Sequence, residues 1–185
     1  MGLLRRFEDR LGSGPVDLRE LVLAVSRIPY GRNAEPSPEA VVDEWRGTCS
    51  TKHLLLLSLV DEGWPERPVQ LWHRPYVVTP SLARELWGAE IAATIPRHGI
   101  VDVHTFATTT VAGGRVRVDV TAPLDDWDGK TDTRLQCGAG EDVPAGDDPL
   151  AVKRGLVERL CDPAVREPFI AALTELHRRP GKGAT

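Results

Sequence analysis

A single cysteine, Cys49, stands a few residues before the leucine run 54–57. The spacing of the apolar residues predicts a helix from about Ser50 to Glu62, with this cysteine at its N-terminus. There, unpaired backbone N–H groups and the positive end of the helix dipole favour a thiolate and could receive an oxyanion. We therefore take Cys49 as a candidate nucleophile for acyl chemistry.

His104 and Asp119 are the candidate partners of that thiol. They fall in segments 100–111 and 115–123, whose alternation of apolar and polar residues predicts a β-hairpin. Alternation places both residues on its polar face, opposite a face of valines. A carboxylate beside an imidazole holds its tautomer and stabilises its charged form, so the pair suits a general base and its orienter. For the pair alone, a solvated sheet face is the competing interpretation.

The turn of this hairpin decides how close the two residues come. A tight turn at Gly113-Gly114 would place Asp119 opposite Thr108, four residues from His104. At a rise of roughly 3.3 Å per residue that is too far for a hydrogen bond. The triad therefore requires a bulge or a shifted turn.

Other polar residues suggest smaller roles. His73, within "LWHRPY", could line a cleft from a neighbouring strand. His53 follows Cys49 by one helical turn, and we expect it to pack or cap rather than to meet the thiol. No Cys/His ligand spacing is present, so we expect no metal site and no cofactor.

The elements that must position these residues follow from periodicity and capping signals, with Ser37 and Thr79 as N-terminal caps and Gly63 as a left-handed C-terminal cap. We expect Cys161 to be a small buried packing residue. Helices are predicted at 17–26, 37–45, 50–62, 79–86, 149–161 and 164–178, strands at 67–78, 100–111 and 115–123, a loop at 125–148 and a disordered tail from 179. Helices followed by an antiparallel sheet indicate an α+β fold. With 185 residues, we expect a single domain, 1–185, with a C-terminal helical extension at about 149–178.

Composition excludes several classes of function. The net charge of −4 predicts no surface for nucleic acid, and no apolar run reaches the length of a membrane span. Three scattered cysteines do not make a disulfide framework, and no signal peptide is apparent, so we expect a cytoplasmic location. Arginine exceeds lysine, which indicates a GC-rich, bacterial genome.

The order of these parts resembles the transglutaminase-like superfamily, the broad papain-like group of Cys-His-Asp proteins. The matching pieces are "IPYGR", "RGTCSTKHLLLLSLVDEG" and "DVHTFATTTVAGGRVRVDVT", within about residues 27–122. The resemblance implies a papain-like fold with N-terminal helices packed on an antiparallel sheet. It makes Cys49 the nucleophile, His104 the general base and Asp119 its orienter, with Trp45 as a candidate for lining the oxyanion site.

The resemblance also implies a reaction. A Cys49 acyl-enzyme would hydrolyse an amide or transfer its acyl group, acting on a peptide, a protein or a small amide. Ser50 stands where true transglutaminases usually carry an aromatic residue, so protein cross-linking is not implied. The alternative from another class is a catalytically silent module of the same fold that binds a peptide or partner protein.

Overall fold

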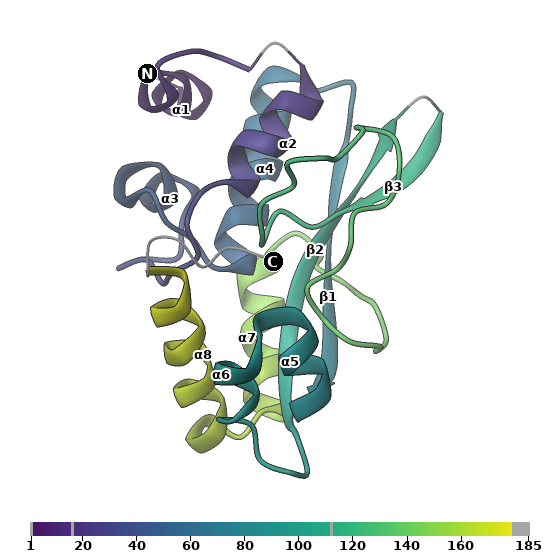
Figure 1. Ribbon diagram of the computed structural model, residues 1–185. Coiled ribbons are helices and arrows are strands. Elements are labelled where there is room, and N and C mark those ends of the chain that lie inside the picture. Colours follow the sequence, from purple (N-terminus) through teal and green to yellow (C-terminus); the bar gives the residue numbers. More distant parts are fainter. Residues whose placement is uncertain (1, 16, 112, 179–185) are drawn as a thin grey trace. The chain divides into compact units, whose positions relative to one another are not determined.

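The computed structural model describes residues 2–15, 17–111 and 113–178 (Figure 1). These residues form eight helices and a four-stranded antiparallel sheet, which confirms the α+β class. The predicted tail from Arg179 lies outside the described residues. Among the helices of the described part, none is long and apolar enough to cross a membrane.

The elements follow the predicted order with three additions, α1, α6 and the short strand β4, which lies within the predicted loop 125–148. Along the chain they are α1 (Leu3–Leu11), α2 (Leu18–Ser26), α3 (Pro38–Glu44), α4 (Cys49–Gly63), β1 (Val69–Val78), α5 (Pro80–Trp87), α6 (Ala89–Ala92), β2 (Ile100–Val111), β3 (Gly114–Val118), β4 (Val143–Pro144), α7 (Pro149–Leu160) and α8 (Pro163–Arg178). The strand order is β3-β2-β1-β4.

The chain divides into two compact units, each made of discontinuous segments. The first unit comprises Met1–Trp72 and Thr105–Leu135, and the second comprises His73–His104 and Gln136–Thr185. Strands β1 and β2 each begin in one unit and end in the other. Cys49 and Asp119 therefore belong to the first unit, whereas His104 and His73 belong to the second.

In the first unit, α4 packs against α1, α2 and α3. The predicted N-terminal cap of α3 is confirmed, because the Ser37 side chain accepts the N–H of Ala40. Asp17 caps α2 in the same way by accepting the N–H of Glu20, a cap that was not predicted. The predicted left-handed cap at Gly63 is wrong. That residue is still helical, and Trp64 ends the helix through an N–H donated to the Val60 carbonyl oxygen, 2.7 Å away.

The hairpin register differs from the predicted one. Val111 pairs with Gly114 and Ala107 pairs with Val118, so the connection lies one residue earlier than Gly113-Gly114. Of these two glycines, Gly113 has a positive φ of 81°, and Gly114 is already the first residue of β3. Thr108 consequently faces Arg117, and the predicted pairing of Asp119 with Thr108 is wrong.

The predicted polar face of β2 is not solvated. Every residue from Asp102 to Thr109 is buried, on both faces of the strand, whereas the neighbouring strand β3 alternates between exposed and buried residues. Of the valines predicted for the core face, Val103, Val116, Val118 and Val120 are buried, and Val101 and Val111 are partly buried.

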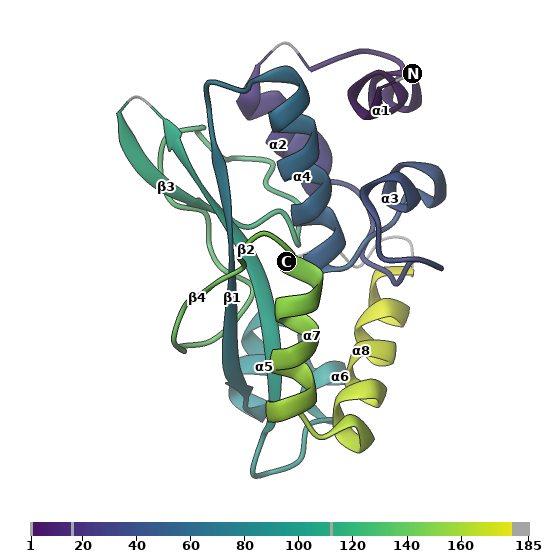
Figure 2. The same ribbon diagram turned by 180° about the vertical axis from the view of Figure 1, so that it is seen from behind.

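The second unit holds the remaining helices. Thr79 caps α5 as predicted, and α7 covers the second unit's part of β2 (Figure 2), where Val103 packs with Leu156 and Cys161. Cys161 thus has the packing role predicted for it, and burial raises the pKa of its thiol.

Candidate active site

Cys49 is the first residue of α4, where the sequence predicted it to be. Its side chain is 8% exposed, and its Sγ lies 4.0 Å from the Ser50 Oγ. The N–H groups of a first helical turn have no partner within the helix. The sulfur therefore sits where a helix favours negative charge.

Hydrogen bonds fix the start of this helix. The Thr51 hydroxyl accepts the backbone N–H of Thr48 at 2.9 Å and donates to Asn33 Oδ1 at 3.1 Å. Asn33 in turn donates through Nδ2 to the Arg46 carbonyl oxygen at 2.7 Å. The first turn of α4 is thereby tied to the segment before α3.

The segment "IPYGR" lies beside the residues that precede Cys49. The Gly47 N–H donates to the Pro29 carbonyl at 3.0 Å, and the Gly31 N–H donates to the Gly47 carbonyl at 3.1 Å. A Cβ on Gly47 would stand only 2.8 Å from Cγ of Lys52, so a larger residue would displace that side chain. Two of the three sequence segments that resemble the transglutaminase-like superfamily thus contact each other just before Cys49.

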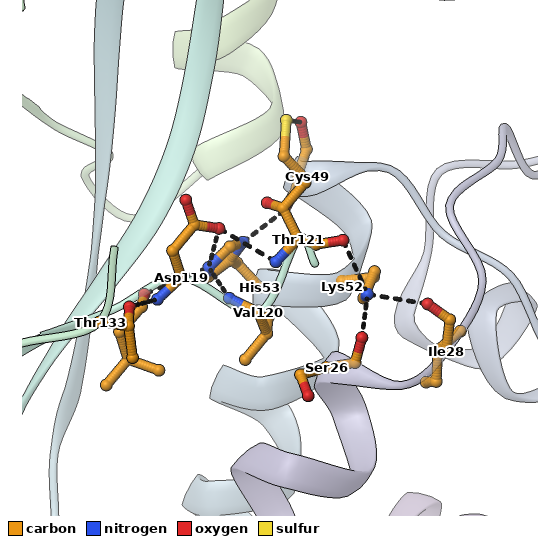
Figure 3. A network of polar contacts seen from close by, with 11 residues as sticks. Ser26, Ile28, Cys49, Lys52, His53, Asp119, Val120, Thr121 and Thr133 are labelled. Carbon is orange, nitrogen blue, oxygen red and sulfur yellow. Dashed lines mark hydrogen bonds and ion pairs between the residues drawn. The ribbon is translucent and has the colours of Figure 1, made fainter. Parts of the chain in front are cut away.

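His53 is fully buried and bonded to backbone at both ring nitrogens (Figure 3). Its Nδ1 is 2.6 Å from the Cys49 carbonyl oxygen and must be the donor, while Nε2 accepts the Val120 N–H at 3.1 Å. Nε2 also lies 3.3 Å from the Val118 carbonyl oxygen, so backbone groups surround both ring nitrogens. His53 is therefore a structural residue, as expected, and not a base for the thiol.

Asp119 lies directly after β3 and is 0% exposed. Its N–H donates to the Thr133 hydroxyl at 2.8 Å, and its Oδ1 accepts the Thr121 N–H at 3.0 Å. The same oxygen is 3.7 Å from Nε2 of His53. The Thr121 N–H thus holds one carboxylate oxygen in place, while the Thr133 hydroxyl fixes the backbone of Asp119.

Lys52 is the functional candidate that the sequence analysis missed. It is 0% exposed, and its Nζ donates to the carbonyl oxygens of Ser26, Ile28 and Thr121 at 2.8, 2.8 and 3.1 Å (Figure 3). Burial lowers the pKa of this amine to about 7, although the negative charges of Asp119 and Cys49 act in the other direction and raise it. A lysine in the first turn of a helix that was expected to be enclosed on nearly all sides was the signal that could have revealed it.

The other predicted residues have identifiable surroundings. The Trp45 ring lies 5.8 Å from that of Phe7 and under the Arg10 guanidinium, and Trp45 ends α3 with a φ of 50°. Its assignment to an oxyanion site stays a prediction.

In the second unit, both predicted histidines are buried. The His104 ring meets Tyr76 edge-on at 6.5 Å. His73 donates through Nε2 to the Pro149 carbonyl at 2.8 Å, and burial lowers its pKa to about 4, so it is neutral near pH 7. The pairing of His104 with Cys49 and Asp119 stays a prediction.

Within the described ranges, no three His, Cys, Asp or Glu side chains are grouped so that they could hold a metal ion. Comparisons of the chain with protein-family models, with curated proteins and with solved structures found no match.

Proposed function

We propose that this chain performs thiol-dependent acyl chemistry at an amide bond, through an acyl-enzyme on Cys49, in a transglutaminase-like fold. The observation that carries the proposal is the position of Cys49 as the first residue of the enclosed helix α4, in the same unit as the buried, hydrogen-bonded Asp119. Three free cysteines agree with a reducing, cytoplasmic location.

The proposed steps follow from the residue types. His104 removes the thiol proton, and the sulfur of Cys49 forms a bond to the acyl carbon while Asp119 stabilises the imidazolium. The first-turn N–H groups of α4 receive the oxyanion, with Trp45 beside them and His73 lining the cleft. The C–N bond then breaks, and the amine leaves with the proton from His104. Water or a second amine releases the acyl group from sulfur.

The observed strand register supports a role for Asp119. The ladder ends at the pair Ala107 and Val118. If it continued by one more pair, Asp119 would lie across from Phe106, which is two residues from His104. The turn predicted from sequence gave an offset of four. The shift is in the direction that the triad requires.

A silent binding module remains the second candidate, and the burial of Asp119 favours it. Holding its own loop in place is a sufficient structural reason for a fully buried carboxylate that accepts a backbone N–H, with no part in catalysis. The two candidates differ in whether Cys49 becomes acylated.

Acylation by p-nitrophenyl acetate tests the proposal. Attack by Cys49 forms a thioester and releases p-nitrophenolate, so we expect a burst of absorbance and an added acetyl group on the peptide that contains Cys49. His104→Ala should lower the burst rate by about 100-fold, the usual contribution of a general base. Added amine then distinguishes transfer from hydrolysis.

Cys137→Ser is the matched control, because Cys137 is the partly exposed cysteine of the chain. This variant should keep the full burst, and Cys49→Ser should lose it. Acetylation distributed equally over the three cysteines, or a Cys49 adduct indifferent to His104, would leave the binding module as the better account.

A further inference from the structure

Lys52 has no role in the steps proposed above, yet, like Asp119, it is fully buried in the first unit. Its three carbonyl partners come from the end of α2, from the residue two positions beyond it and from the segment after β3. Only an ammonium has three protons to donate, so this cage of acceptors is built for the charged form.

The placement of the cage adds to this argument. Ser26 is the last residue of α2, and the C-terminal end of a helix carries partial negative charge that favours a cation. Lys52 stands three residues after Cys49 on α4, so both side chains belong to the first turns of one helix.

We propose that Lys52 is a positioning residue that holds a buried ammonium group near Cys49 and thereby stabilises the Cys49 thiolate below neutral pH. The inference rests on the proposed function, because it assigns to Lys52 a part of the thiol activation given there to His104 and the helix. It acts through charge and not through contact with a substrate.

The charged and titratable groups around the ammonium are few. Asp119 and Cys49 both interact with it electrostatically, and both favour its charged form. The ring nitrogens of His53, the next residue, face the Cys49 and Val118 carbonyl oxygens and the Val120 N–H, and Nε2 is 3.7 Å from Asp119 Oδ1. At pH 6, below the Lys52 pKa of about 7, the amine is an ammonium, so this is where its effect on Cys49 is largest.

The rate of iodoacetamide alkylation as a function of pH separates this role from a purely structural one. We expect Lys52→Met to slow the alkylation of Cys49 at pH 6 by about tenfold, since the loss of one nearby positive charge raises a thiol pKa by about one unit. The difference should shrink toward none by pH 9, where Lys52 is neutral and the thiol ionises in either protein. Peptide mass spectrometry reports each cysteine separately.

Two variants complete the design. Lys52→Gln keeps hydrogen-bond donors without the charge and should behave like Lys52→Met, so it decides the question if the methionine variant does not fold. Lys52→Arg keeps the charge and should retain most of the reactivity at pH 6. Lys130→Met is the control, because it removes an exposed lysine of the same unit and should change nothing.

A folded Lys52→Met or Lys52→Gln protein with the wild-type pH profile at Cys49 would overturn the inference. The result is independent of acyl transfer, because iodoacetamide needs only the thiolate. Absence of acylation by p-nitrophenyl acetate together with a Lys52-dependent alkylation profile would reject the proposed reaction and keep the role of Lys52.

Discussion

Lys52 and His53 are consecutive residues that use backbone groups for opposite purposes. The lysine gives its protons to three carbonyl oxygens, and the histidine both donates to a carbonyl and accepts an N–H. Because their partners are backbone atoms, the exact side chains at Ser26, Ile28, Val120 and Thr121 matter less than the path of the chain there.

Burying Lys52 should make stability depend on pH in alkaline solution. Its pKa is about 7 in the folded chain and about 10.5 when exposed, so the unfolded chain holds an extra proton between these values. Folding is therefore penalised below pH 7, and stability should rise as pH increases from 7 toward 10.5. The slope is at most about 1.4 kcal/mol per pH unit, the value for one proton.

Urea unfolding of wild type and Lys52→Met at several pH values between 7 and 10 measures this dependence. The difference between the two free energies of unfolding isolates the lysine from other groups, with Lys130→Met as the control for net charge. A difference that stays constant across this range would show that Lys52 keeps its proton in the folded chain.

At the scale of elements, local signals were the reliable ones. The caps at Ser37 and Thr79 were predicted because a capping side chain acts within three residues of itself. The start of α4 was predicted to within one residue from the spacing of its apolar residues. The cap of α2 at Asp17 and the left-handed Gly12 that ends α1 are local signals of the same kind that were not used.

Longer-range features were harder to predict. Both Gly113 and Gly114 could have adopted the positive φ of the turn. Gly113 adopts it, because Gly114 pairs with Val111 in the strand ladder. The burial of β2 on both faces depends on neighbouring elements and not on its own alternation. Periodicity likewise treats a lysine as solvent-facing, so the carbonyl cage of Lys52, formed by residues 24 to 69 positions away, could not be foreseen.

The cap of α4 offers a test at this scale. Thr51→Val preserves the shape of the side chain but removes the acceptor for the Thr48 N–H and the donor to Asn33. We expect a loss of about 1–2 kcal/mol in the free energy of unfolding, typical of a lost cap with a partner left unsatisfied. Thermal or urea unfolding measures it.

Ser58→Ala, a partly buried site farther along the same helix, is the comparison variant and should cost less. Equal losses for the two substitutions would mean that the Thr48–Thr51–Asn33 contacts add nothing to the stability of α4. The Cys49 alkylation rate in Thr51→Val gives a second readout, because a frayed first turn would present its N–H groups to the sulfur less well.

At the scale of the whole molecule, the two units are joined by unbroken strands. The division falls between Trp72 and His73 in β1 and between His104 and Thr105 in β2. A strand cannot lose one half of its ladder without weakening the hydrogen bonds of the other half. Each unit is compact, but neither contains the whole of β1 or of β2.

We therefore expect a single unfolding transition. Leu59→Ala removes a fully buried side chain of α4 and should cost about 2–5 kcal/mol. The loss should appear equally in the fluorescence of Trp127, in the first unit, and in the thiol labelling of Cys161, in the second. Coincident midpoints are the measurement, as for any two-state transition.

Separate midpoints, with only the Trp127 transition displaced by Leu59→Ala, would show that the units unfold independently. Val103→Ala, in the second unit, is the reciprocal variant and should also displace both signals. Its cost is expected to be smaller, because fewer methyl groups are removed.

The contacts of Lys52 also set an order of events during biosynthesis. The lysine is translated 69 residues before Thr121, the last of its three carbonyl partners. At about 5–20 residues per second, several seconds pass between the two. Throughout that interval the ribosome carries a chain whose Cys49 lacks both this cage and Asp119. The thiol is therefore in its least activated state while the chain is still being made, when unwanted acylation of the nascent chain would do the most harm.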